Sequence, residues 1–101
     1  MNTNQLFWNI DSLIFKYYEF KNYFTVSENI KSGYTTYQYK INNIIALNLH
    51  LRYYRCNIME FILESEDRKV INIIKEVCQK EKFNTFNDIN SEQTLIIKRN
   101  I

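Results

Sequence analysis

The sequence predicts a two-layer α+β domain, with a four- to five-stranded, mainly antiparallel sheet and two helices in the order α-β-β-β-β-α-β. Three observations predict this class. Residues 45–54 alternate between apolar and mostly polar side chains, as in a strand with one buried face. Residues 70–78 carry apolar side chains at helical spacing. One glycine and no proline in 101 residues exclude a many-turned sandwich and a glycine-rich nucleotide-binding fold.

The first element is predicted to be a helix that Thr3 or Asn4 caps. Its apolar stripe consists of Leu6, Ile10, Leu13, Ile14 and Tyr17. Trp8 and Phe15 lie off this stripe, on nearly one line, and allow two interpretations. Either the helix buries a wide apolar face, or it presents a second, exposed aromatic contact. The wide buried face is the favoured interpretation, because packing against a core is the ordinary reason for such breadth.

A hairpin is predicted next, because the apolar period changes from helical to alternating. The first strand covers about residues 18–26, and residues 27–33, with the only glycine, form the turn. Residues 34–41 are dense in Thr, Tyr and Ile and form the return strand. Asn42 and Asn43 end it, since asparagine tolerates the left-handed conformation that a tight turn needs.

The stretch 45–54 is predicted to be the central strand, with Leu47, Leu49 and Leu51 facing the helices. A helical alternative exists, because a 3–4 spacing also connects Ile44, Leu47, Leu51, Tyr54, Ile58 and Phe61. The strand is preferred because the alternation continues for the whole stretch. A short turn at 55–57 and a fourth strand at 58–63, apolar on both faces apart from Glu60, follow.

The second helix is predicted to begin after Ser65 as N-cap, with Glu66 and Asp67 in its first turn. Its buried stripe consists of Val70, Ile71, Ile74, Val77 and Cys78. Residues 83–91 are polar and predict a connection anchored by Phe83, Phe86 and Ile89. Residues 94–97 predict a last strand. The whole chain, residues 1–101, is expected to be one domain, without repeat or linker.

Charge and composition restrict the function classes. The net charge is +2, and the basic side chains form no block, whereas strong nucleic-acid binders usually concentrate Lys and Arg. Asn, Ile, Lys, Tyr and Phe dominate, which indicates AT-rich codons and a low-GC bacterium, phage or mobile element as the source. No secretory signal pattern is present, and the longest apolar run has four residues. We therefore expect a cytoplasmic protein without a membrane segment, and Cys56 and Cys78 as reduced core residues.

The sequence offers no catalytic, metal-binding or cofactor-binding motif. His50 is the only histidine and is expected to be solvated on a strand, with no nucleophile elbow nearby. Two cysteines and one histidine at scattered spacing make no zinc signature. Asp11, Glu19 and Lys21 have the spacing of a metal-dependent nuclease site, but E-x-K arises easily in a Lys-rich chain and Asp11 falls on a predicted helix. We therefore expect no enzyme activity and no cofactor.

Tyrosine provides the strongest functional signal. All eight tyrosines lie between residues 17 and 54, in the first hairpin and the central strand. Strand alternation places a partner-binding set on the face away from the helices: Lys21, Tyr23, Tyr34, Gln38, Lys40, His50, Arg52 and Tyr54. Tyr and Arg are typical of protein interfaces, and a tyrosine face can also stack single-stranded nucleic acid. The third alternative is that tyrosines only fill exposed strand positions, which they favour.

These features favour a non-enzymatic protein-binding module. By analogy of class, we expect a small phage or mobile-element inhibitor of a host defence enzyme, such as an anti-CRISPR-type protein, that acts by steric or competitive binding in the host cytoplasm. Its partner would be a larger host protein, such as a nucleic-acid enzyme, and a homodimer is compatible with this interpretation. The alternatives are a single-stranded nucleic-acid-binding protein and a toxin-neutralising immunity protein.

Overall fold

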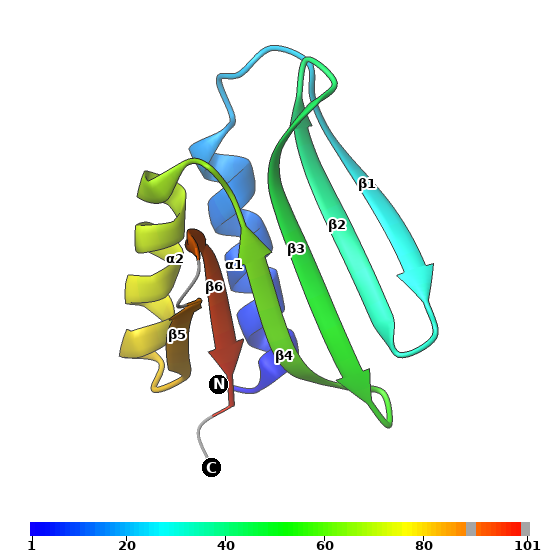
Figure 1. The fold of residues 1–101 in the computed structure, drawn as a ribbon, viewed down its shortest axis with the longest axis vertical. Coiled ribbons are helices and arrows are strands. Elements are labelled where there is room, and N and C mark those ends of the chain that lie inside the picture. Colours follow the sequence, from blue (N-terminus) through cyan, green and yellow to red (C-terminus); the bar gives the residue numbers. More distant parts are fainter. Residues whose placement is uncertain (89–90, 100–101) are drawn as a thin grey trace.

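The computed structural model describes residues 1–88 and 91–99, which form two helices and six strands (Figure 1). Their order and bounds are α1 (Thr3–Tyr17), β1 (Phe24–Lys31), β2 (Tyr34–Ile41), β3 (Ile44–Tyr54), β4 (Asn57–Glu64), α2 (Arg68–Lys80), β5 (Asn84–Asp88) and β6 (Ser91–Lys98). All neighbouring strands are antiparallel, in the spatial order β1-β2-β3-β4-β6-β5. The predicted α+β class is confirmed, with six strands in place of the four to five expected.

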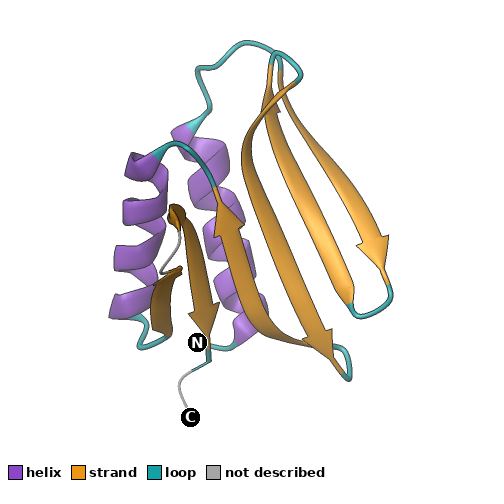
Figure 2. Cartoon of the chain, in the orientation of Figure 1, coloured by secondary structure: helices purple, strands orange, loops and turns teal. Residues whose placement is uncertain are grey.

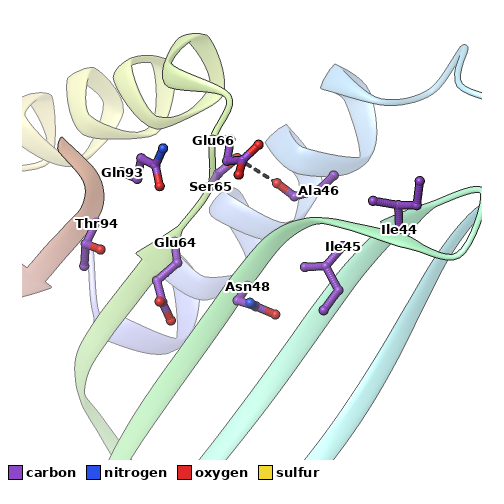
Figure 3. Close-up of a pocket in the computed structure, with 9 residues that line it drawn as sticks. All are labelled: Ile44, Ile45, Ala46, Asn48, Glu64, Ser65, Glu66, Gln93 and Thr94. Atoms are coloured by element: carbon purple, nitrogen blue, oxygen red, sulfur yellow. Dashed lines mark hydrogen bonds between the residues drawn. The ribbon is translucent and has the colours of Figure 1, made fainter. Parts of the chain in front are cut away.

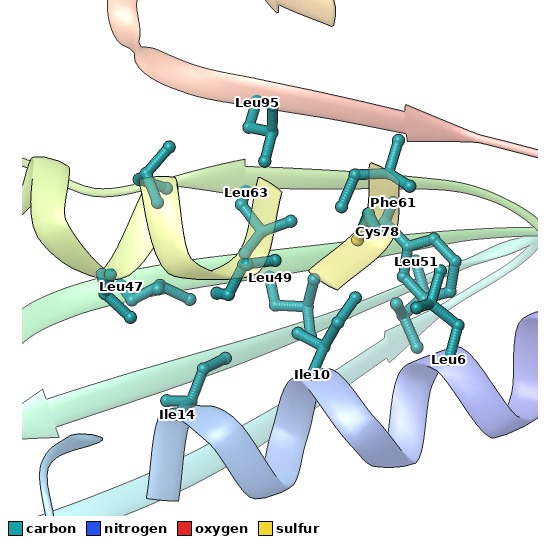
Figure 4. Close-up of a cluster of buried hydrophobic side chains, with 14 of the residues drawn as sticks. Leu6, Ile10, Ile14, Leu47, Leu49, Leu51, Phe61, Leu63, Cys78 and Leu95 are labelled. Carbon is teal, nitrogen blue, oxygen red and sulfur yellow. The ribbon is translucent and has the colours of Figure 1, made fainter. Parts of the chain in front are cut away.

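Both helices lie on the same face of the sheet (Figure 2). Leu6, Ile10 and Ile14 point from α1 toward the sheet, where they meet the buried side chains of β3 and β4 (Figure 4). Each fully buried side chain of this kind contributes about 1.5–3 kcal/mol of hydrophobic stabilisation. The predicted inward residues Leu47, Leu49 and Leu51 are all fully buried, so the face of the central strand is confirmed.

Helix α1 begins one or two residues earlier than predicted. Asn2, rather than Thr3 or Asn4, is the N-cap: its Oδ1 accepts from the Gln5 N–H at 2.8 Å, and Gln5 Oε1 accepts from the Asn2 N–H at 2.9 Å. The prediction that α1 buries a wide apolar face is wrong, because Trp8 is 64% exposed and Phe15 is 45% exposed. Phe15 still packs edge-on against Phe24, with ring centroids 5.2 Å apart.

In the first hairpin, the predicted bounds of the first strand and of the turn are wrong, whereas the predicted return strand 34–41 is confirmed as β2. β1 starts at Phe24, not near residue 18, and it continues through most of the predicted turn to Lys31. Only Ser32 and Gly33 connect it to β2, and Gly33 takes the positive φ of +72° that glycine adopts without strain. The prediction failed because β1 is exposed along most of its length, and an exposed edge strand is as polar as a loop. The polar run 27–29 therefore looked like a turn.

The next two hairpins, β2–β3 and β3–β4, turn on pairs of left-handed residues. Asn42 and Asn43 have φ values of 52° and 64°, which confirms the predicted asparagine turn. Arg55 and Cys56 have φ values of 49° and 66° between β3 and β4. Irregularities follow on both sides of β3, between Tyr39 and Lys40 on β2 and at the end of β3 near Tyr53. β3 is therefore a strand throughout, and the helical alternative is excluded.

Helix α2 is capped by Asp67, not by the predicted Ser65. Asp67 Oδ1 accepts from the Lys69 N–H at 3.1 Å. Ser65 instead ties the helix entrance to the sheet, because its Oγ donates to the Ala46 carbonyl at 2.7 Å and accepts from the Asp67 N–H at 3.0 Å. The predicted stripe is confirmed for Val70, Ile71, Ile74 and Cys78, which are buried, while Val77 is half-buried.

The C-terminal part contains one more strand than expected. Residues 84–88 form β5, so the predicted polar connection over 83–91 is wrong there. Phe83 is buried as an anchor, whereas Phe86 is exposed, and the predicted anchor Ile89 lies outside the described residues. Both cysteines are free, but only Cys78 is buried; the expectation of a buried Cys56 is wrong, because Cys56 lies in an exposed turn.

Candidate functional site

The sheet has an open face, which we define as the face opposite the two helices. Side chains alternate along each strand, and the strand register aligns those of the open face into rows. Three rows cross the centre of the sheet: Ser27–Gln38–Asn48–Glu64–Thr94, Asn29–Thr36–His50–Ile62–Ile96–Phe86, and Lys31–Tyr34–Arg52–Glu60–Lys98–Asn84. Tyr34, Gln38, His50 and Arg52, predicted from separate strands, thus lie side by side.

His50 is held in the middle row by contacts on both ring nitrogens. Its Nδ1 lies 2.9 Å from Thr36 Oγ1, and its Nε2 lies 2.5 Å from Glu64 Oε1. The ring centroid of Tyr34 is 5.9 Å away. Only 20% of the imidazole side chain is exposed, so the prediction of a solvated histidine is wrong.

A hydroxyl, an imidazole and a carboxylate in line are also the parts of a nucleophilic triad. Such a triad needs donors that stabilise an oxyanion above the nucleophile. Backbone N–H groups inside an antiparallel sheet lie in the plane of the sheet and bond neighbouring strands, so those of β2, β3 and β4 do not point toward a substrate on the open face. Thr36, His50 and Glu64 therefore form an ordered polar cluster to which the backbone of these three strands adds no oxyanion donor.

Glu60 organises the third row. Its Oε2 lies 3.4 Å from Lys98 Nζ and 3.9 Å from Arg52 Nη2, and the Glu60 side chain is largely buried between these cations. Arg52 itself is 58% exposed, so solvent screens the pair and its contribution to stability is about 0–1 kcal/mol. The Arg52–Glu60 ion pair holds the Arg52 guanidinium over the open face, beside Tyr34, which is opposite Arg52 in the strand register.

Two shallow hollows open on this face. One, of about 560 Å³, is lined by Asn29, Lys31, Tyr34, Thr36, Gln38, His50, Ile62, Glu64, Asp88 and Thr94. The other, of about 320 Å³, lies near the start of β3, where Ile45, Asn48, Glu64 and Thr94 point to the same side (Figure 3). Glu64 and Thr94 line both hollows, so the two hollows adjoin each other.

The remaining predicted residues lie around this centre or away from it. Lys40 is half-buried beside Ile45, and Tyr54 is exposed at the end of β3 with the Arg55 guanidinium 5.3 Å from its ring centroid. Lys21 and Tyr23 lie in the loop before β1 and not on a strand, which corrects their predicted place among the strand residues of the face. The reason is that β1 begins only at Phe24.

Sequence reasoning missed Thr36, Ile62 and Glu64, which complete the surroundings of His50. Their signal was present in part: each has the outward parity of its strand. Odd or even position along a strand does not give the register between strands, and it is the register that brings these three residues beside His50.

Two tyrosines belong to the core: Tyr39, on the helix side of β2, and Tyr18, directly after α1. The Tyr39 hydroxyl donates to Asp11 Oδ1 at 2.7 Å, and burial together with this carboxylate raises the pKa of Tyr39. Burial also raises the pKa of Tyr18 to about 12. Asp11 is therefore engaged with Tyr39, while Glu19 and Lys21 are exposed in the following loop. The three residues with the spacing of a metal-dependent nuclease site are therefore not arranged as such a site.

Across residues 1–88 and 91–99, no group of three His, Cys, Asp or Glu side chains is arranged to hold a metal ion. Within the same ranges, neither helix combines the length and apolar character needed to cross a membrane. No protein-family model, curated protein or solved structure matches the chain.

Proposed function

We propose that the protein is a non-enzymatic binding module that docks a larger protein on the open face of its sheet. The observation that carries this proposal is the set of three rows on adjacent strands. Tyr34 and His50 line one hollow, and Arg52 lies next to Tyr34 in the strand register. Tyr and Arg are the residue types most often found as binding hot spots.

The composition of the rows supports a protein partner over a nucleic acid. Ile62 and Ile96 occupy the middle row, and charged side chains flank them, which is the apolar centre and polar rim of a protein interface. The charges of the open face are mixed, with Lys31, Lys40, Arg52 and Lys98 beside Glu60, Glu64 and Asp88. A phosphate backbone crossing this face would approach carboxylates, whereas a protein can present both signs.

Order on the open face before binding also supports the proposal. His50 is held by Thr36 and Glu64, and Arg52 by Glu60. Immobilising a flexible side chain costs about 0.5–1.5 kcal/mol on association, so side chains that are already held lose less on binding. The fixed groups would then recognise a partner by hydrogen bonds as well as by shape.

In this proposal the module acts by occupying its partner's surface, sterically or in competition with another ligand. The finer expectation, a phage or mobile-element inhibitor of a host defence enzyme in the host cytoplasm, depends on residue usage and on analogy of class and stays a prediction. An immunity protein would use the same mode of action against a toxin.

A capture experiment with matched variants tests the proposal. Tagged wild type, the double variant Tyr34→Ala/Arg52→Ala and the control Ile73→Ala/Lys80→Ala would be exposed to lysate of candidate hosts. The control also removes one exposed large side chain and one cation, but from α2. We expect wild type and control to retain the same protein and the open-face variant to lose it. Equal retention by all three proteins contradicts the proposal. Wild type that captures no protein but binds a single-stranded oligonucleotide in a salt-sensitive way contradicts it as well.

A further inference from the structure

The two edges of the sheet differ in length and regularity. β5 has five residues and an irregularity between Asn87 and Asp88. β1 has eight residues, all paired in unbroken register with β2, and among the described strands β2 is its only neighbour in the sheet (Figure 1). Short length, bulges, proline and charged side chains are the usual protection of a sheet edge. β1 is long, regular and free of proline, and its protection is limited to the charges of Glu28 and Lys31.

The backbone groups that point outward from β1 can be assigned. The Asn42 N–H donates to the Tyr23 carbonyl at 3.3 Å, and these two residues continue the register of β1 and β2. Hydrogen-bonded positions alternate along an antiparallel strand, so the odd residues of β1 bond to β2. The N–H and C=O groups of the even residues therefore face outward: Phe24, Val26, Glu28 and Ile30.

The side chains of these four residues lie on the helix side of the sheet, opposite β2 residues of the same parity. Phe24 and Val26 are half-buried there, while Ile30 is 71% exposed. β1 thus combines a free hydrogen-bonding edge with an exposed apolar side chain at its far end. Glu28 is the one charge on this side of the strand, and it restricts which partner strand can pair.

We propose that β1 pairs antiparallel with β1 of a second copy of this chain, so that two six-stranded sheets become one continuous sheet. This inference goes beyond the proposed function, because it uses the sheet edge and not the open face. A two-fold axis through Ser27 places each Phe24 opposite the partner's Ile30, and each Val26 opposite the partner's Glu28. The exposed isoleucine then gains an aromatic cross-strand neighbour, a favourable pair in antiparallel sheets.

The register is selected by charge. A two-fold axis one residue further along, through Glu28, would place two carboxylates directly opposite each other, which is destabilising. The axis through Ser27 separates them diagonally. It also keeps both helix layers on one side, so the open faces of the two copies join into a surface of twice the width. The edge is self-complementary in this register, since an apolar residue near either end meets an apolar residue of the other copy, and this favours a second copy over an unrelated peptide.

Sedimentation of the full chain from about 1 μM to 1 mM tests the proposal, because pairing along one edge buries less than a standard interface and predicts a weak dimer. Glu28→Pro removes one outward N–H, and a proline is tolerated on an edge strand. Glu28→Thr removes the same charge but keeps the N–H. We expect wild type and Glu28→Thr to dimerise and Glu28→Pro to dimerise at least about tenfold more weakly, a change of about 1.4 kcal/mol.

Amide hydrogen exchange gives a readout that does not depend on a variant folding. In wild type, the amides of Val26, Glu28 and Ile30 should become protected as concentration rises, whereas those of Thr25, Ser27 and Asn29 should be protected at every concentration. A chain that stays monomeric at 1 mM overturns the proposal. So does a dimer that leaves the even amides of β1 exchanging freely, or one that Glu28→Pro leaves unchanged while folded.

Discussion

His50 Nε2 lies 2.5 Å from Glu64 Oε1, so a side chain of β3 reaches diagonally to one of β4 across the open face. A carboxylate can only accept here, which makes the imidazole Nε2–H the donor. Neutral His50 then carries its proton on Nε2, and Nδ1 accepts from the Thr36 hydroxyl at 2.9 Å. The pair therefore determines the tautomer and the orientation of the ring that faces the partner.

The tautomer is the first prediction. Imidazole ¹⁵N shifts of neutral His50 should show the Nε2–H form in wild type. Glu64→Ala removes the acceptor and should give a mixture of tautomers, while Glu66→Ala, which removes a neighbouring exposed carboxylate, should change nothing. A wild-type ring protonated on Nδ1 would contradict the assignment.

Loss of the open-face anchors should weaken binding without unfolding the chain. Tyr34→Ala and Arg52→Ala should each cost about 2 kcal/mol or more in binding to an identified partner, roughly thirtyfold in Kd. The free energy of unfolding of Arg52→Ala should change by about 1 kcal/mol or less, because Arg52 is mainly exposed and its ion pair is screened. Calorimetric titration and urea unfolding of the same preparations measure both quantities. If the variants lose stability as much as they lose affinity, unfolding and not a missing contact explains the weaker binding, and the prediction is wrong.

Leu49→Ala should show the opposite pattern. Leu49 is fully buried beneath the helices, so the substitution leaves a cavity and should lower the free energy of unfolding by about 2–5 kcal/mol. Partner affinity, measured at a temperature where the variant is fully folded, should stay within about threefold of wild type, since Leu49 is on the far side of the sheet. Strong loss of affinity in a folded Leu49→Ala protein would place the interface on the helix side.

Replacement of a strained turn residue should stabilise the protein. Cys56 has a φ of 66° in an exposed turn, and a non-glycine residue in this region costs about 1–2 kcal/mol. Cys56→Gly should therefore raise the free energy of unfolding by about 1 kcal/mol. Gly33→Ala is the reciprocal case, since Gly33 has a φ of 72° with open space around it, and it should lower that free energy by a similar amount. Urea unfolding decides the sign of each change.

Alkaline pH should destabilise the fold through buried groups. Burial raises the pKa of Tyr18 to about 12 from an ordinary value of 10.0, so the unfolded chain loses that proton first. The stabilisation is fully present below pH 10 and is lost as pH rises toward 12, with a slope of up to about 1.4 kcal/mol per pH unit for this group. Burial likewise raises the pKa of the Cys78 thiol to about 12 from an ordinary value of 9.0. The stabilisation from this thiol therefore starts to fall near pH 9. Tyr18→Phe should flatten the decline of unfolding free energy between pH 10 and 11, and an unchanged slope would contradict this.

The fold was largely predictable because period and parity are local properties. Alternation in 45–54 was enough to place Leu47, Leu49 and Leu51 inside and His50 and Arg52 outside. The bounds of β1 were not predictable, because an edge strand exposed to water has the polar composition of a loop. Lys21 and Tyr23 were misplaced for this reason.

The surroundings of His50 were not predictable because two irregularities set the register. From the tight turn at Asn42 and Asn43, uninterrupted pairing would place His50 opposite Thr35. The shift between Tyr39 and Lys40 moves Thr36 there instead. A second shift near Tyr53 places Ile62 opposite His50 and Glu64 on its diagonal. These shifts restore a common face for the outward residues of β2, β3 and β4, and no local pattern in the sequence indicates where they occur.

Photo-cross-linking in living host cells tests the central claim most directly. A photoreactive amino acid would replace Gln38, which lines the hollow of the open face, or Asn72, which is exposed on α2. The account predicts that position 38 cross-links to one larger protein, that unlabelled wild type competes this product away, and that position 72 gives no such product. Cross-links to protein from position 72 alone, or from position 38 to nucleic acid alone, would contradict it.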